Sequence, residues 1–220
     1  MQRAVVAENQ LIPYEVSPLP AGPWLVFAPH ADDETFGMGG SLAKASEQGL
    51  DTHVVIVTDG ALGGNISDLI EVRQRETREA TNLLGVNTLQ WWSEPDRGLV
   101  HSSRLVKKIA QLIGELAPAS VFFPGLLELH PDHRMTAQLV WAALKSLEAP
   151  PVAFAYEISV QSPVNRLIDI SAQRAIKGQA MAVYVSQNGQ NNYPELVQAL
   201  NTTRTFTLAA SVRQAEGLFE

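Results

Sequence analysis

The most constraining feature of the sequence is an apolar run, Trp24 to Ala28, that leads directly into an ionisable segment. A short apolar run of this kind, bounded by a turn signal, predicts a buried strand. Pro29 ends the strand because proline has no N–H to donate to a sheet ladder. His30, Asp32 and Asp33 then follow within four positions. Ligands of open α/β sheets bind beyond the carboxyl ends of the strands, so we expect a metal or substrate site here.

A second segment of the same kind lies about a hundred residues further along the chain. The apolar run Ser120 to Pro124 predicts another buried strand, and Leu129-His130-Pro131-Asp132-His133 follows it. The two segments hold three of the five histidines. This concentration is the main functional signal of the sequence.

Strand and helix patterns alternate along the rest of the chain. Further strands are expected at 53–58, 88–92, 152–158, 167–170 and 204–208, and helices at 41–48, 68–84, 103–116, 132–147, 171–184 and 194–200. Glycines 37, 39 and 40 are expected to form a close turn before the helix that begins at 41. The alternation predicts a three-layer, Rossmann-like α/β fold with a mainly parallel sheet and the site at the carboxyl ends of its strands. A chain of 220 residues predicts one domain, 1–220.

Composition excludes several classes of function. The net charge of −7 argues against a nucleic-acid partner, which needs a basic face. Cysteine is absent, so a metal would have to be held by histidine and carboxylate side chains. The sequence has no signal-peptide pattern and no apolar run of about 18 residues, so we expect no membrane span and a cytoplasmic enzyme. A homo-oligomer is compatible with these observations.

The spacing of the polar residues suggests a metal centre. His30, Asp33 and the distant His133 provide two imidazoles and one carboxylate. Three protein ligands with open positions are typical of a catalytic metal, and zinc suits this set. Zinc lowers the pKa of a bound water to about 7, so hydroxide becomes available at neutral pH.

The remaining ionisable residues fit supporting roles around that metal. Asp32, next to a ligand, is free to take the proton of the water as general base. His130 is placed to protonate a leaving amine or to stabilise an oxyanion. Asp132 is placed to hydrogen-bond a histidine and fix its tautomer, as carboxylates around metal sites do.

Both segments resemble the signatures of one protein family. Pro29-His30-Ala31-Asp32-Asp33-Glu34 is similar to the His-Pro-Asp-Asp-Glu signature of the PIG-L/LmbE-like N-deacetylases, and His130-Pro131-Asp132-His133 to their second signature. Weaker similarities extend the resemblance from about residue 24 to 187: Thr58-Asp59-Gly60, Arg73-x-x-Glu76, Leu84-Gly85, Pro95-Asp96, Gly98-Leu99, Lys177 and Tyr184-x-Ser186-Gln187. Ala31 departs from the pattern because it replaces the usual proline.

The resemblance implies a zinc-dependent hydrolase that removes the N-acetyl group from an N-acetylglucosamine-type sugar or glycoconjugate by zinc-hydroxide attack on the amide. It implies these roles: zinc ligands His30, Asp33 and His133, with one Zn²⁺ per chain; general base Asp32; general acid or oxyanion stabiliser His130, tuned by Asp132; sugar contacts Arg73 and Asp96. The partner would be a small-molecule N-acetyl sugar conjugate, which the sequence does not identify further.

Two other functions are compatible with the same residues. Two histidines and one carboxylate also hold iron in non-haem iron(II) enzymes, although those enzymes commonly have a β-rich scaffold. A metal-binding member of the fold without activity is the other alternative. Glu34 has two candidate roles, as a charge at a helix N-terminus or as a support for the ligand segment.

Overall fold

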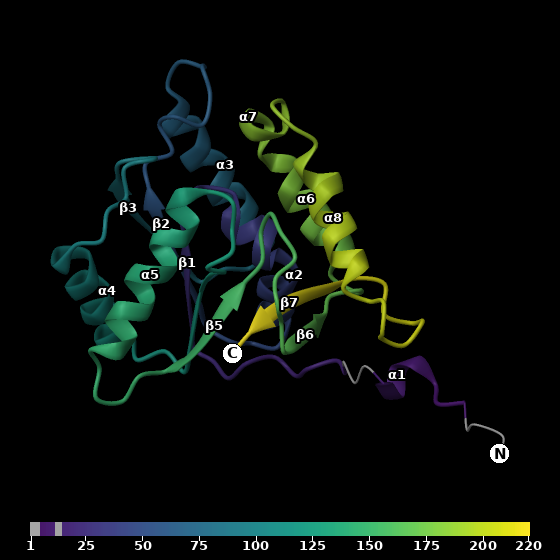
Figure 1. Cartoon of the computed structure of the whole chain (residues 1–220). Coiled ribbons are helices and arrows are strands. Elements are labelled where there is room, and N and C mark those ends of the chain that lie inside the picture. Colours follow the sequence, from purple (N-terminus) through teal and green to yellow (C-terminus); the bar gives the residue numbers. More distant parts are fainter. Residues whose placement is uncertain (1–4, 12–14) are drawn as a thin grey trace.

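The computed structural model describes residues 5–11 and 15–220. In this part of the chain, seven strands form one sheet in the order β3-β2-β1-β4-β5-β7-β6 (Figure 1). Their bounds are β1 Trp24–Ala28, β2 Thr52–Thr58, β3 Thr88–Glu94, β4 Ser120–Pro124, β5 Val152–Tyr156, β6 Arg166–Asp169 and β7 Ala215–Phe219. The first five are parallel, and β7 runs antiparallel to β5 and β6. The expected α/β fold with a mainly parallel sheet is confirmed.

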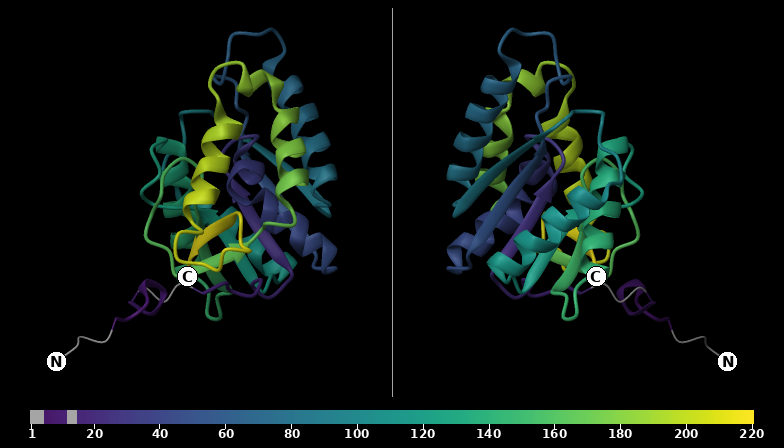
Figure 2. Two further views of the ribbon diagram at one scale, coloured as in Figure 1. Left: turned by 90° about the vertical axis from the view of Figure 1, so that its right-hand side faces the viewer. Right: turned by 90° about the vertical axis from the view of Figure 1, so that its left-hand side faces the viewer.

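Helices cover both faces of the sheet. The described helices are α1 Glu8–Leu11, α2 Asp33–Glu47, α3 Leu69–Leu83, α4 Ser103–Leu116, α5 Pro131–Lys145, α6 Arg174–Val183, α7 Val185–Asn188 and α8 Tyr193–Thr203. Helices α4 and α5 pack on one face, and α2, α3, α6 and α8 lie on the other, as the two side views of Figure 2 show. Of the helices described, none combines the length and the apolar character needed to cross a membrane.

The apolar run from Trp24 to Ala28 forms the central strand β1. Trp24, Val26 and Ala28 face the core beneath α2, α3 and α6. Leu25 and Phe27 face the core beneath α4 and α5. All five side chains are fully buried. Because helices cover both faces, this strand has no position at which a polar side chain would meet water.

Strand order brings the two polar segments together. The chain runs from β1 outward through β2 to β3, and then returns to place β4 on the other side of β1. This change of direction makes the junction of β1 and β4 a topological switch point, where α/β folds bind ligands. Strands β1 and β4 are parallel, with Trp24 opposite Ser120. The segments after both strands therefore meet at one edge of the sheet, as predicted.

Helix α2 begins at Asp33, and the prediction of a glycine turn before residue 41 is wrong. The glycines lie inside the helix, where they allow close packing. A Cβ atom on Gly37 would lie 2.5 Å from the ring of Tyr156, and one on Gly40 would lie 2.7 Å from Ile170. Close approach, and not a turn, is the reason for these glycines.

The expected last strand at 204–208 is also wrong. Those residues form turns after α8, and the last strand is β7. Strand β7 has the sequence Ala-Glu-Gly-Leu-Phe, and its Glu216 is almost fully buried. A charged residue and a glycine interrupt the apolar pattern, so the sequence does not show a buried strand there.

Candidate active site

The segment after β1 folds back on itself around the carboxylate of Asp33. The backbone N–H of His30 donates to Asp33 Oδ2 at 2.8 Å, and His30 Nδ1 lies 3.1 Å from the same oxygen. Asp32, which lies between His30 and Asp33 in the chain, has φ +128°, a backbone conformation that residues other than glycine rarely adopt. Such strain persists only where the surroundings enforce it, and it is common at active sites.

The start of α5 supplies the second group of side chains. His130 is the N-cap, and its Nδ1 accepts a hydrogen bond of 3.2 Å from the backbone N–H of Asp132. Pro131 follows as the first helical residue, where its missing N–H costs nothing. His133 lies within the first turn, and its Nε2 is 3.2 Å from Asp33 Oδ2. One carboxylate oxygen therefore meets both a histidine from the β1 side and one from α5.

Each of these two histidines also contacts an outer carboxylate through its other ring nitrogen. His30 Nε2 lies 3.3 Å from Asp132 Oδ2, and His133 Nδ1 lies 3.4 Å from Glu128 Oε2. Metal-binding histidines usually have this arrangement, in which the outer partner fixes the tautomer. Two ligand atoms of a tetrahedral zinc, each about 2.0–2.1 Å from it, lie about 3.3–3.4 Å apart. The two contacts of Asp33 are close to that separation, and the types of donor suit zinc. Among the described residues, however, the donors that all lie within 4.8 Å of one another group His30 and His133 with His130 and not with Asp33.

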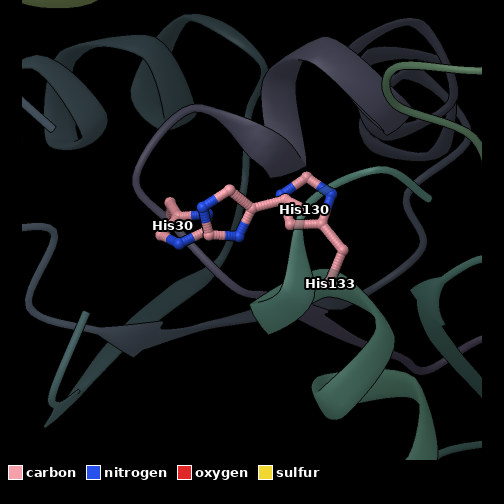
Figure 3. Close-up of side chains that lie close together, drawn as sticks. All are labelled: His30, His130 and His133. Carbon is pink, nitrogen blue, oxygen red and sulfur yellow. The ribbon is translucent and has the colours of Figure 1, made fainter. Parts of the chain in front are cut away.

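Other donor atoms lie close by. His30, His130 and His133 each present a ring nitrogen within 4.8 Å of the other two, and Figure 3 shows the rings gathered near the start of α5. A second group of donors with the same spacing consists of His30, Asp96, His130 and Asp132. Two overlapping groups of atoms able to bind a metal therefore share His30 and His130.

Asp32 lies beside this cluster and faces Arg73. Burial raises the pKa of Asp32 to about 7, although the positive charge of Arg73 opposes the rise. Arg73 Nη2 lies 3.4 Å from Asp32 Oδ2 and donates to the carbonyl oxygen of Ala31 at 2.8 Å. Arg73 Nη1 donates to the carbonyl oxygen of Gly60 at 3.3 Å. Arg73, expected to contact the sugar, thus directs donors to the loop that carries Asp32.

Charge within the cluster keeps Asp33 ionised. Burial raises the pKa of Asp33, but His133 and His30 outweigh burial and hold it well below its usual range. Burial lowers the pKa of His133, yet the contact with Asp33 raises it to about 9. Burial and the two neighbouring histidines lower the pKa of His130. Neutral His130, with Nδ1 accepting from Asp132, carries its proton on Nε2.

Asp96 and Asp132 both approach His30. Asp96 Oδ1 lies 3.4 Å from His30 Nε2, and Asp96 Oδ2 accepts from the N–H of Leu62 at 2.9 Å. Burial opposes ionisation of Asp96, but its hydrogen bond with His30 lowers the pKa to about 2. Asp132 was expected to tune His130, and its carboxylate instead contacts His30. Only its backbone N–H reaches His130, because both residues belong to the same helix start.

Glu128 is a site residue that the sequence pattern did not indicate. It is 1% exposed, and its carboxylate accepts from the backbone N–H groups of Ile158 at 2.7 Å and Ser159 at 3.1 Å. It therefore joins His133 to the segment after β5. Its position two residues before His130 was the one available signal, and nothing in the spacing distinguished it from a surface glutamate.

Glu34 supports the strained loop. Its Oε2 accepts from the backbone N–H of Asp32 at 3.1 Å, and its Oε1 accepts from the hydroxyls of Thr35, at 2.7 Å, and Tyr184. Burial raises the pKa of Glu34, although these donors oppose the rise. The contacts match the second of its two candidate roles, as a support for the ligand segment.

A cavity of about 410 Å³ opens above these side chains. All of the predicted site residues line it except Asp132, which lies behind His30. A cavity of this size suits a small molecule. Asp33 supplies an ionised carboxylate beside the two candidate metal ligands His30 and His133, and Asp32 and His130 lie next to them. Together these groups suit metal-assisted hydrolysis.

The chain matches a known protein family. Residues 25–144, more than half of the chain, match the family described as PIG-L: GlcNAc-PI de-N-acetylase. A probable N-acetyl-alpha-D-glucosaminyl L-malate deacetylase 2 of Bacillus anthracis is 29% identical over 135 residues, 56% of this chain and 59% of that protein. The diacetylchitobiose deacetylase of Thermococcus kodakarensis is 31% identical over 118 residues, 50% of this chain and 44% of that protein. The chain thus spans about half the length of these two relatives.

A solved structure extends the likeness over nearly the whole chain. A conserved protein from Thermus thermophilus is 30% identical, with a TM-score of 0.81, and the match covers 91% of this chain and 94% of that one. The family match ends at residue 144, before α6, α7 and α8. The structural likeness therefore extends well beyond the part of the chain that the family model describes.

Proposed function

The chain belongs to the PIG-L family, and from this membership and the geometry of the site we propose that it is a metal-dependent N-deacetylase. Its substrate would be an N-acetylglucosamine-type sugar or glycoconjugate. The observation that carries the proposal is the shared contact of His30 Nδ1 and His133 Nε2 with Asp33 Oδ2, beside the separate carboxylate of Asp32 in one cavity.

His30, Asp33 and His133 are the residues that would hold the metal, one ion per chain. When bound, a divalent ion such as zinc supplies a Lewis acid that polarises a carbonyl and lowers the pKa of water to about 7. Asp132 and Glu128 keep the two imidazoles oriented through their outer nitrogens.

The other side chains would move the protons. Asp32 takes a proton from the attacking water, and its pKa of about 7 suits a base at neutral pH. The C–N bond of the amide breaks as the new C–O bond is completed, and acetate and a free amine result. Neutral His130 donates a hydrogen bond from its Nε2–H to the oxyanion, and the proton that Asp32 has taken passes to the leaving nitrogen. Arg73 holds the loop of Asp32, and Asp96 would accept a hydrogen bond from a sugar hydroxyl.

The test is acetate release from a panel of N-acetylglucosamine conjugates, with and without a chelator. We expect release that a chelator abolishes and added Zn²⁺ restores. Metal binding without release from any conjugate would favour a non-catalytic member of the family. Restoration by Fe²⁺ and not by Zn²⁺ would reassign the metal.

The first prediction concerns metal content. We expect about one zinc ion per chain, and we expect His133→Ala to lose most of it because an open three-ligand site loses one of its three donors. Elemental analysis of the purified proteins measures this. His101→Ala is the matched control, since His101 is exposed and lies outside the cavity. Undiminished metal in His133→Ala would refute the ligand assignment.

A second prediction concerns Glu128, the outer partner of His133. Glu128→Gln keeps the size of the side chain but removes the charge that faces His133 Nδ1. We expect metal affinity to fall on the order of 10–100-fold, as for other outer-shell carboxylates. Competition with a chromophoric chelator measures the affinity, and Glu148→Gln on the exposed surface is the control. Equal affinity in the two variants would assign Glu128 a purely structural role.

A further inference from the structure

The cavity lining contains two unlike groups of residues besides the catalytic ones. One group is polar and consists of Gln187, Gln190 and Asn191. The other group is apolar, and we call it the α8 wall. It consists of Tyr193, Leu196, Val197 and Leu200 of α8 together with Phe36 of α2. The family match ends at residue 144, so the α8 wall lies mostly outside it.

The α8 wall is one continuous surface. Positions 193, 196, 197 and 200 are three or four residues apart and therefore share one face of the helix. Phe36 extends that face toward the catalytic groups, because its ring centroid lies 5.9 Å from that of Tyr193. Phe36 also follows Asp32 and Asp33 by one helical turn, so the apolar surface begins next to the reacting centre.

Large aliphatic side chains lie exposed where this surface meets solvent. Leu196 is 55% exposed, and Leu129, which also lines the cavity, is 69% exposed. Phe36 and Val197 are 5% exposed and continue the apolar surface inward. An exposed apolar surface that continues into a cavity with catalytic groups is typical of a ligand-binding site.

The two arginines in the cavity lining already donate to protein acceptors. Among the described lining residues, Arg73 and Arg97 carry the fixed positive charges. Arg73 donates to the loop of Asp32, and Arg97 Nη2 donates to the carbonyl oxygen of Leu62 at 3.1 Å. Both arginines thus have protein acceptors, while several aspartates face the same space.

We propose that the cavity accepts N-acyl sugars that carry an alkyl or aryl group, and that the α8 wall binds this group. The group is attached either as the aglycone or as a longer N-acyl chain. The proposal rests on the proposed function for the sugar and the scissile amide, and it adds the class of substituent.

The experiment compares kcat/KM for methyl and octyl N-acetyl-β-D-glucosaminide, below the micelle concentration, with the zinc-loaded protein. Each methylene that leaves water contributes up to about 4-fold, so partial burial of the chain predicts a gain of at least about tenfold for the octyl compound. Methyl N-octanoyl-β-D-glucosaminide tests the N-acyl position in the same way. A gain in either series supports the proposal and identifies the position of the alkyl group.

Leu196→Gln tests the wall directly. We expect it to reduce the ratio of octyl to methyl kcat/KM by at least about threefold, because glutamine cannot replace the apolar contact. Leu83→Gln is the matched control, since Leu83 is a 39% exposed leucine near the end of α3 and does not line the cavity. An equal ratio in the wild type, Leu196→Gln and Leu83→Gln proteins would overturn the proposal.

Binding without turnover separates this proposal from the proposed function. Calorimetry on metal-free protein measures the affinities of the methyl and octyl compounds. If the octyl compound binds more tightly than the methyl compound and Leu196→Gln removes this difference in affinity, the α8 wall is an apolar subsite, even if no acetate is released. Release of acetate from the methyl compound with no gain in rate or affinity for either octyl chain would overturn the inference and leave the deacetylase proposal intact.

Discussion

Asp32→Asn is expected to lower turnover on the order of 10²–10⁴-fold, the usual contribution of a general base, and to leave the bound metal in place. Asparagine has the shape of aspartate but does not take a proton from water. Aspartate and asparagine are both enriched among the non-glycine residues with positive φ, so the substitution keeps the backbone preference of the wild-type residue. The Asp32 carboxylate contacts Arg73, whereas Asp33 is the carboxylate that meets both histidines.

Asp33→Ala supplies the contrast, because we expect it to weaken metal binding itself. His130→Ala should resemble Asp32→Asn, with metal retained and rate lost. Acetate release and zinc content, measured side by side, separate the roles, and Asp51→Asn on an exposed loop is the control. Loss of zinc in Asp32→Asn with zinc retained in Asp33→Ala would exchange the two roles. Full activity of Asp32→Asn would exclude Asp32 as the base.

Lys177→Met is expected to lower the free energy of unfolding by about 3–5 kcal/mol, because it leaves a buried carboxylate without its partner. Lys177 Nζ donates to Glu216 Oε1 at 2.7 Å, and both side chains are 1% exposed. Burial lowers the pKa of Lys177, but Glu216 opposes this. The same lysine donates to the carbonyl oxygen of Phe36 at 2.9 Å and to Asn201 Oδ1 at 2.8 Å. Glu216 also accepts from backbone N–H groups inside α2.

Urea unfolding measures this loss, and Lys107→Met on the exposed side of α4 is the control. The double variant Lys177→Met with Glu216→Gln should be less destabilised than the sum of the two single variants, because it contains no unpaired buried charge. A loss of less than about 1 kcal/mol in Lys177→Met would mean that Glu216 finds other compensation, such as a bound proton or water.

The sequence predicted the fold and the position of the site because both depend on local patterns. The run Trp24 to Ala28 has the composition of a strand covered on both faces, and the histidines follow two such strands. Parallel strands then bring their carboxyl ends to one edge. These relations require only short-range patterns and the geometry of parallel sheets.

The features that the sequence did not predict depend on contacts between distant residues. Glycines 37 and 40 resembled a turn because Tyr156 and Ile170, which they accommodate, are far away in the chain. Glu128 and Glu216 resembled surface residues because their partners lie on other elements. A buried charge is recognisable only with its partner, and a pattern within one segment does not contain that partner.

The position of β7 between β5 and β6 has a consequence for the order of folding. Strand β6 precedes β7 in the chain, yet among the named strands it pairs with β7 alone. During synthesis, β1 to β5 can assemble as each strand emerges, whereas β6 must wait for residues 215–219. Glu216 arrives with that strand, and its carboxylate oxygens accept from the backbone N–H groups of Gly40 and Ser41 in α2. The helix that begins with Asp33 therefore lacks these two contacts in its middle until β7 has been synthesised.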